Sequence, residues 1–437
     1  MRLALISPKG VGMGTNEENQ WTEELYDSLS GIDSLRELMS CANSPLLTVA
    51  SILNSYFDEM EYIDEEIEEI NWSKQYDMVA MSFMTQQAAR AFKLAETFRD
   101  KGVYLIAGGM HPTNSSEETL KYFDTVFIGE CETTLPQFMR DYVKKKPLRK
   151  YENNCEINMD DVPLPRYDLL KVERYKTIPV QISRGCPHDC EFCASTKVYG
   201  PKYRHKSAAR VMQEIEMIQE LKSNPHIYFT DDNMLVKKDF AVELLDAMKG
   251  QRIRWMTHTD ISVADQDEIL KRLFLAGCRK LVIGFESIIP ESLSAVEKWK
   301  YNRMKRYGEE IQKIQSYGIG VWGTFIVGLD GDDTSVFQRV IDFTLENNLY
   351  GAMISVPTPF PGSSLYERLL EEERILSSDW GSYTLWNVVV QPKNMSVEEL
   401  RNGFRYVLSQ IYSKEATEKR MEYFKNIYST LLRREKR

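Results

Sequence analysis

The chain has 437 residues, enough for two or three domains, and its 43% hydrophobic and 27% charged residues are typical of a globular protein. Its net charge of −10 argues against general nucleic-acid binding, which requires a basic surface. No apolar run reaches the roughly 18 residues of a membrane span, and the seven cysteines suggest no disulfide framework. We therefore expect a reduced, cytoplasmic protein that binds neither nucleic acid nor membrane.

Short apolar runs alternate with helical patterns in the first part of the chain, residues 1–145. Strands are expected at 2–7, 59–63, 77–82, 103–107 and 125–128, and helices at 46–57, 86–99, 117–123 and 134–143. This alternation predicts a Rossmann-like domain, with a parallel sheet covered on both faces. A ligand of such a sheet binds beyond the carboxyl ends of its strands.

Glycines and small polar residues follow these strands, as a ligand site at that edge requires. Ser7 and Ser82 end two strands, Gly108 and Gly109 follow a third, and Gly129 follows a fourth. Glycine lets a ligand approach the backbone closely, and small polar groups can hydrogen-bond to its edges. Because no G-x-G-x-x-G follows the first strand, the pattern argues against a nicotinamide site.

A second alternation of strands and helices fills residues 177–370, after a proline-containing linker at 146–176. Strands are expected at 178–183, 226–231, 253–258, 280–285, 321–327 and 352–356, and helices at 208–221, 238–248, 265–276, 305–316 and 335–346. Six such units predict a partial (β/α)6 barrel of the TIM type. Its chemistry should lie at the carboxyl ends of the strands.

Three cysteines, Cys186, Cys190 and Cys193, follow the first of these strands at C-x3-C-x2-C spacing. Thiolates are the soft ligands that iron–sulfur clusters use. Three of them would leave one iron of a [4Fe–4S] cluster open to another ligand. A structural zinc site with His188 as its fourth ligand is the alternative.

Polar groups follow later strands of the predicted barrel. Asp231 and Asp232 end the second strand, Glu286 ends the fourth, and Gly328 follows the fifth. Aspartates after a buried strand are costly unless they meet a partner, and a cationic amine would suit them.

The cysteine motif, with Phe192 before its last cysteine, resembles the signature of the radical S-adenosylmethionine (SAM) superfamily. The resemblance implies a [4Fe–4S] cluster on the three cysteines. It also implies SAM bound near Phe192, Asp231, Asp232, Glu286 and Gly328.

The first domain is similar to the cobalamin-binding domain of B12-dependent radical SAM enzymes, through G-G-x-H-P-T at 108–113, V-F-I-G-E-x-E at 126–132 and the linker D-V-P-L-P-R-Y-D at 161–168. The D-x-H-x2-G motif, which supplies a histidine to cobalt, is absent, so the resemblance implies cobalamin without such a ligand. A domain that binds nothing is the alternative. The implied cobalamin contacts are Ser7, Ser82, Met84, Thr85, Gln86, Gly108, Gly109, His111, Pro112, Gly129 and Glu130.

The implied activity is reductive cleavage of SAM to a 5′-deoxyadenosyl radical, followed by modification of an unactivated carbon of a small-molecule or peptide substrate. C-methylation through methylcobalamin is the expected outcome, with a flavodoxin- or ferredoxin-type protein as electron donor. Cyclisation or rearrangement without methyl transfer, and a non-catalytic cobalamin-binding protein, are the alternatives. A methylthiotransferase is excluded, because only two cysteines, Cys41 and Cys131, precede the linker and the C-terminal tail is too short for an RNA-binding domain.

Residues 371–437 leave the strand–helix pattern. Helices are expected at 397–412 and 415–433, and Ser396 with Glu399 has the spacing of a capping box. This aromatic-rich segment is expected to pack on the barrel, or to cap the active site and select the substrate.

Overall fold

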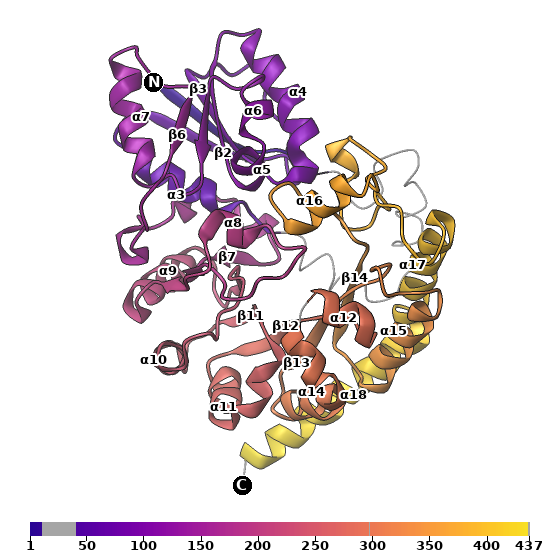
Figure 1. Ribbon diagram of the computed structural model, residues 1–437. Helices are drawn as coiled ribbons and strands as arrows, with labels where there is room; N and C mark the ends of the chain where they lie inside the picture. Colours follow the sequence, from indigo (N-terminus) through magenta and orange to yellow (C-terminus); the bar gives the residue numbers. More distant parts are fainter. Residues whose placement is uncertain (11–40, 297, 436–437) are drawn as a thin grey trace.

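The computed structural model describes residues 1–10, 41–296 and 298–435. Figure 1 shows the first domain, in indigo and purple, above the barrel, with the C-terminal helices along the side of the barrel. The predicted fold is confirmed: a Rossmann-like domain, a partial barrel and a helical C-terminal segment follow one another. None of the helices in the described ranges has the length and hydropathy needed to span a membrane.

The first sheet has six parallel strands in the order β2-β1-β3-β4-β5-β6. Its strands are β1 (Arg2–Ser7), β2 (Glu59–Asp64), β3 (Met78–Ser82), β4 (Tyr104–Gly108), β5 (Thr125–Ile128) and β6 (Lys150–Glu152). The last was not expected, since it lies in the predicted linker and only Tyr151 of its three residues is buried. The Tyr151 ring stacks on Phe127 of β5, and this contact holds the strand at the sheet edge.

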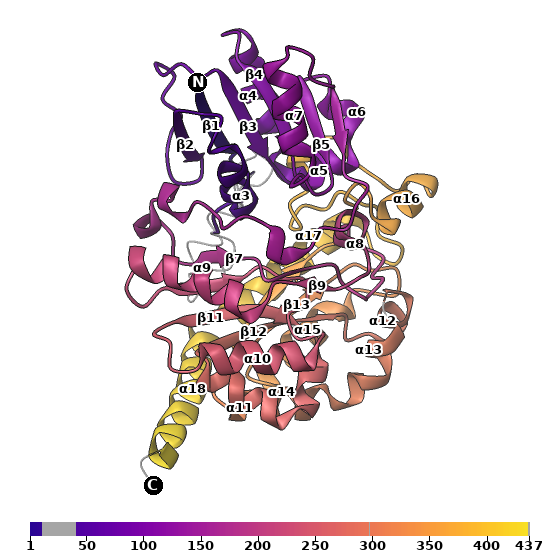
Figure 2. The same cartoon turned by 90° about the vertical axis from the view of Figure 1, so that its left-hand side faces the viewer.

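Helices cover both faces of this sheet (Figure 2). They are α3 (Ser44–Leu53), α4 (Ala88–Arg99), α5 (Met110–Asn114), α6 (Ser116–Thr119) and α7 (Thr134–Val143). Phe92, Ala95 and Phe98, three residues of the apolar face expected for α4, pack in the core with Ala91, whereas Ala89, expected on the same face, is exposed. The helices expected at 46–57 and 117–123 are shorter than predicted.

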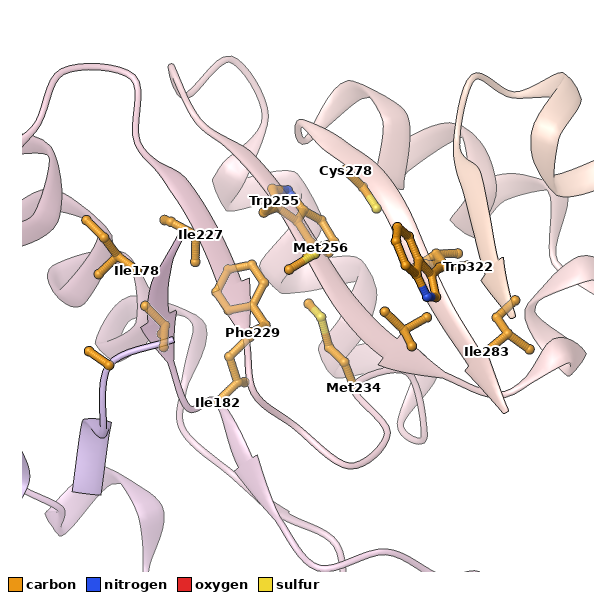
Figure 3. Close-up of a cluster of buried hydrophobic side chains, with 14 of the residues drawn as sticks. Ile178, Ile182, Ile227, Phe229, Met234, Trp255, Met256, Cys278, Ile283 and Trp322 are labelled. Atoms are coloured by element: carbon orange, nitrogen blue, oxygen red, sulfur yellow. The ribbon is translucent and has the colours of Figure 1, made fainter. Parts of the chain in front are cut away.

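The second sheet is a six-stranded, all-parallel partial barrel in the order β14-β13-β12-β11-β10-β7. Its strands are β7 (Ile178–Val180), β10 (His226–Phe229), β11 (Arg254–Thr259), β12 (Cys278–Glu286), β13 (Gly320–Ile326) and β14 (Gly351–Ser355). Figure 3 shows apolar side chains of these strands, among them Phe229, Trp255 and Trp322, which are buried in the large core.

The five predicted helices of the barrel are present, with bounds equal to the expected ranges or within two residues of them. They are α9 (Ala208–Leu221), α10 (Lys238–Met248), α11 (Asp267–Leu275), α14 (Tyr307–Ser316) and α15 (Ser335–Glu346). Shorter helices α8 (Ser195–Tyr199), α12 (Pro290–Val296), α13 (Lys298–Arg303) and α16 (Ser364–Glu371) were not predicted.

The strand predicted at 178–183 is divided. Its last residue belongs instead to β8 (Ser183–Arg184), which pairs antiparallel with β9 (Arg204–His205). The carboxylate of Asp231 accepts the backbone N–H groups of Ile182 and Ser183, so those groups are not available to the barrel ladder. The chain therefore leaves the sheet just before the cysteines.

The C-terminal helices are α17 (Val397–Ile411) and α18 (Lys414–Glu435), close to the predicted ranges. The capping box of Ser396 and Glu399 is present at the start of α17. The apolar face of α17 joins the barrel core beside α15 and β14, so this helix packs on the barrel. The preceding segment reaches the first domain, where the Trp380 indole N–H donates to Glu118 at 2.8 Å.

Candidate functional site

One cavity of about 1280 Å³ lies between the two sheets and is here called the shared cavity. Ser7, Ser82 and Gly129 line it from strand ends of the first domain, and Thr230 and Asp232 line it from the end of β10. Its volume exceeds the roughly 300–1,000 Å³ of ordinary small-molecule pockets, so it has room for more than one ligand.

Most of the predicted cobalamin contacts meet at this cavity. Its lining includes Ser7, Ser82, Met84, Gln86, Gly108, Gly109, Gly129 and Glu130. The predicted contacts that do not belong to the lining are Thr85, His111 and Pro112. The structure therefore brings together the residues at the strand ends and places these three behind them.

Two features of this lining bear on whether it can hold a corrinoid ring, which is rich in amides. Gly109 has φ +102°, and a Cβ atom there would lie 2.9 Å from the Phe83 backbone nitrogen and the Ser82 Oγ. The position therefore requires glycine, because the backbone here packs directly on the end of β3. The Gln86 Oε1 atom is buried with no hydrogen-bond partner, and an amide N–H of a ligand would satisfy it.

His111 is fully buried and lies among aromatic rings outside the lining. Its Nδ1 is 3.3 Å from Thr85 Oγ1, and its ring lies 5.3 Å from that of Trp380. Burial lowers the pKa of His111 to about 4, so the imidazole is neutral at physiological pH. In this position it joins the first domain to the C-terminal segment and does not reach a ligand in the cavity.

The cysteine loop, residues 185–203, is held at its two ends by the β8–β9 pair. Gly185 has φ +87°, and a Cβ there would lie 2.2 Å from the Lys202 carbonyl oxygen, so the turn into the loop requires glycine. Cys186, Cys190 and Cys193 are partly exposed and form no disulfide.

The three thiols suit an iron–sulfur cluster in number and chemistry. Within residues 1–10, 41–296 and 298–435, no group of three or more Cys, His, Asp or Glu side chains is close enough to hold a single metal ion. A cluster binds each thiolate through a different iron, so its ligands lie farther apart than those of one ion. Burial raises the pKa of Cys193, so iron binding must displace its proton.

The two aspartates predicted to contact SAM have different surroundings. Asp231 is buried, and its carboxylate accepts the backbone N–H of Ile182 and the Ser183 hydroxyl, at 3.1 and 2.6 Å. Burial raises the pKa of Asp231 to about 7, although these hydrogen bonds oppose the shift. Asp232 lines the shared cavity, where burial raises its pKa and a hydrogen bond with Ser195 lowers it. Of the two, Asp232 is therefore placed to meet a cationic ligand.

Glu286 ends β12 with φ +62°, a strained conformation for a residue other than glycine and one that often marks functional sites. Its carboxylate pairs with the Lys300 ammonium at 2.9 Å, and both side chains are almost buried. The Glu286 carboxylate folds back so closely over Gly284 that a Cβ there would lie 2.1 Å from Oε1. Position 284 is therefore occupied by glycine because the Glu286 side chain fills the space that a Cβ would need.

The other two predicted SAM contacts lie near apolar clusters. Gly328 has φ +96° after β13, and its N–H donates to Asp332 Oδ2 at 2.9 Å. Phe192 packs against two small clusters that include Leu365 and Leu293. Of the five predicted SAM contacts, Asp232 belongs to the lining of the shared cavity and the other four do not, and the contact of all five with SAM stays a prediction.

An ion-pair network between the domains was not expected from the sequence. The Arg184 guanidinium of β8 donates to Glu130 and Glu132 of the first domain, at 2.6 Å each, and Arg204 lies 2.9 Å from Glu130. The side chains of Arg184, Glu130 and Glu132 are each less than 10% exposed. The two partners lie more than 50 residues apart in the chain, and pairing over such a distance leaves no periodic signal in the sequence.

Trp386 is a second residue that sequence analysis did not assign to the site. It lines the shared cavity, although it belongs to the C-terminal segment beyond the barrel. The aromatic content of that segment was the available signal, and it left both packing on the barrel and capping of the active site open.

Comparisons with known proteins agree with this architecture. The model of the radical SAM superfamily matches residues 180–344, and a domain of unknown function, DUF4070, matches residues 363–437. A bacteriochlorophyllide d C-12(1)-methyltransferase of Chlorobaculum tepidum is 28% identical over 387 residues, which cover 86% of this chain and 84% of that protein. The hopanoid C-2 methylase of Rhodopseudomonas palustris is 25% identical over 76% of this chain and 65% of its own length.

Two solved structures share the fold. The radical SAM methyltransferase TsrM of Kitasatospora setae, with cobalamin and a [4Fe–4S] cluster bound, has a TM-score of 0.62 at 14% identity, covering 85% of this chain and 75% of its own. The cobalamin-dependent enzyme OxsB, with aqua-cobalamin and SAM bound, has a TM-score of 0.61 at 16% identity, covering 85% of this chain and 55% of its own.

A partial barrel with a three-cysteine loop beyond its first strand is the architecture of a radical SAM domain, and here it is joined to a Rossmann-like domain. Residues 180–344 match the radical SAM superfamily, and the chain as a whole shares the fold of TsrM and OxsB. The resemblance inferred from the sequence motifs is thereby confirmed.

Proposed function

We propose that the chain is a cobalamin-dependent radical SAM methyltransferase that adds a methyl group to an unactivated carbon of a small molecule. The observation that carries this proposal is the shared cavity, which is lined by strand ends of both sheets. Ligands of parallel sheets bind beyond those ends, so a ligand of the first domain and a ligand of the barrel would face each other across it. The named carbon methyltransferases among the relatives support the same reaction.

The residues take the following roles in this proposal. Cys186, Cys190 and Cys193 hold the cluster, and the Asp232 carboxylate accepts a hydrogen bond from the ammonium group of SAM. Glu286 and Gly328 contact the rest of SAM, and the eight strand-end residues of the lining hold cobalamin. When bound, the cluster and SAM supply the radical that removes a hydrogen atom, and cobalamin supplies the methyl group. The walls of the cavity exclude water from the reacting carbon.

The substrate that we propose is a largely apolar molecule with a flat or polycyclic skeleton. Trp386, Tyr199 and Val198 line the cavity on the barrel side and offer aromatic and aliphatic surface. The named relatives methylate bacteriochlorophyllides and hopanoids, which are compounds of this kind.

We further assign residues 1–145 to cobalamin binding, 146–176 to a linker, 177–370 to the radical SAM barrel and 371–437 to a helical C-terminal segment. The electron donor in this proposal is a flavodoxin- or ferredoxin-type protein of the cytoplasm.

Anaerobic reconstitution with iron, sulfide and hydroxocobalamin tests the proposal, followed by absorption spectroscopy and metal analysis. We expect about four irons and about one cobalt per chain, and formation of 5′-deoxyadenosine and S-adenosylhomocysteine once an apolar substrate is added. A Cys190→Ala variant should lose the iron, and a Cys155→Ala variant, altered at an exposed cysteine outside the loop, should keep it.

Other outcomes would replace the proposal with a specific alternative. Four irons without cobalt would make the first domain a substrate or structural module. Iron and cobalt with 5′-deoxyadenosine but no methylated product would indicate a cyclase or rearranging enzyme. Zinc without iron would indicate a structural site at the cysteines, and cobalt with no SAM cleavage would indicate a cobalamin-binding protein.

A further inference from the structure

We infer that Arg184 is a positioning residue that couples corrinoid binding in the first domain to the cysteine loop of the barrel. This inference rests on the proposed function, because it takes the two ligands from that proposal. Arg184 stands two residues before Cys186, and its side chain reaches back into the first domain. The coupling is thus a direct mechanical connection between the two proposed cofactor sites.

The carboxylate side of this connection belongs to the loop that follows β5. Gly129 and Glu130 line the shared cavity, and the Gly129 N–H donates to Thr113 Oγ1 at 3.1 Å. Thr113 also lines the cavity. A ligand seated against these residues therefore contacts the same loop that carries the carboxylates of Glu130 and Glu132.

The guanidinium side of this connection is fixed in several directions. Arg184 donates from Nη1 to Glu130 and from Nη2 to Glu132, both at 2.6 Å, and from Nε to Gln181 at 2.8 Å. Burial alone would lower the pKa of Arg184. The nearby carboxylates, Glu132 foremost, outweigh this effect and raise the pKa above its ordinary value, so the residue stays charged. Because a buried guanidinium binds two carboxylates in a fixed geometry, a shift of either glutamate moves Arg184.

The backbone of Arg184 transmits such a shift to the cysteines. On one side, Asp231 holds the neighbouring Ser183 by its hydroxyl and backbone N–H. On the other side, the Gly185 backbone packs against Lys202, since a Cβ at residue 185 would lie 2.2 Å from the Lys202 carbonyl oxygen. A displacement of Arg184 is therefore passed on to Cys186 and is not absorbed in the turn.

Coupling between two binding sites is reciprocal, so each ligand must change the affinity for the other by the same factor. A coupling of ordinary size gives about a 5- to 150-fold change in affinity. We expect the cluster-loaded protein to bind hydroxocobalamin at least about fivefold more tightly than the protein without its cluster.

The test uses the full chain, with its cluster reconstituted anaerobically or removed by a chelator, titrated with hydroxocobalamin and followed by corrinoid absorbance. The Arg184→Lys variant keeps the positive charge but cannot bind both carboxylates through a planar fork, so its affinity ratio should fall to one. Lys171→Gln is the matched control, because it removes an exposed ion pair between the linker and Glu68 of the first domain. This control should keep the wild-type ratio.

A second readout does not depend on affinity. The electron paramagnetic resonance signal of the reduced cluster should change when hydroxocobalamin binds to the wild type or to Lys171→Gln, and should stay constant in Arg184→Lys. A ratio of one in the wild type, or a wild-type ratio in Arg184→Lys, would overturn the coupling alone. Failure of the wild type to take up any corrinoid would overturn the proposed function together with the coupling.

Discussion

The buried ion pair at the end of β12 allows a stability effect to be separated from a binding effect. Glu286 and Lys300 lie 2.9 Å apart, with side chains only 11% and 6% exposed. The Glu286→Gln change removes the carboxylate that pairs with the Lys300 ammonium in a nearly water-free site. Breaking a buried pair in this way costs about 3–5 kcal/mol, whereas breaking an exposed pair costs about 0–1 kcal/mol.

We expect Glu286→Gln to lower the free energy of unfolding by about 3–5 kcal/mol, measured by denaturant titration of the protein without added cofactors. The double change Glu286→Gln with Lys300→Met removes the buried charge as well, so most of the stability should return. The exposed pair of Lys171 and Glu68 supplies the control, since Glu68→Gln should cost less than about 1 kcal/mol.

SAM affinity distinguishes the role of the carboxylate from the role of the pair. If Glu286 contacts SAM, the double variant should bind SAM about tenfold or more weakly although it is stable again, because charged hydrogen bonds to a ligand contribute about 1.5–3 kcal/mol. The reasoning would be refuted by a loss of less than about 1 kcal/mol in Glu286→Gln. Recovery of full SAM affinity in the double variant would refute the proposed contact.

Three further changes test other parts of the site. Gly109→Ala should weaken corrinoid binding at least about tenfold, since its Cβ would lie 2.9 Å from the Phe83 nitrogen, whereas Gly102→Ala, at φ +75° with nothing within 4 Å, should affect only stability, by about 1 kcal/mol. Burial raises the pKa of Asp231 in the folded state from its ordinary value of 3.8 to about 7, so its contribution to stability is fully present below pH 3.8 and is lost as the pH rises through 7. Relative to Asp231→Asn, the wild type should therefore lose about 3 kcal/mol between about pH 5 and pH 8 in denaturant titrations, and parallel pH profiles would contradict this. Trp386→Ala should raise the KM for an apolar substrate about tenfold and leave 5′-deoxyadenosine formation without substrate unchanged; an unchanged KM would exclude Trp386 from the substrate site.

Features of the chain with a local physical cause could be predicted from the sequence. The bounds of β1, α7, α9, α10 and α15 agree with the expected ranges, because apolar residues at a period of two or 3.6 already fix which face of an element is buried. The C-x3-C-x2-C spacing likewise identified the cysteine loop, since ligands on one short loop need no tertiary information to be recognised.

The boundaries of elements were predicted less well where a distant residue competes for backbone groups. Asp231 takes the N–H groups of Ile182 and Ser183, so the expected first strand of the barrel ends at Val180. β6 was missed because a three-residue edge strand with one buried side chain gives almost no alternation.

By itself, the sequence determined the order of the domains, the two parallel sheets and the strand ends at which ligands should bind, because these follow from short-range patterns and from the rule that parallel sheets bind at their carboxyl edge. Only the tertiary structure decided which of those residues face the shared cavity. The tertiary structure buries the His111 ring among aromatic side chains beside Trp380. It also brings Arg184 into contact with Glu130, which is 54 residues away in the chain. The physical reason is that burial and charge pairing depend on how two separately patterned domains meet, and no period within either domain encodes that contact.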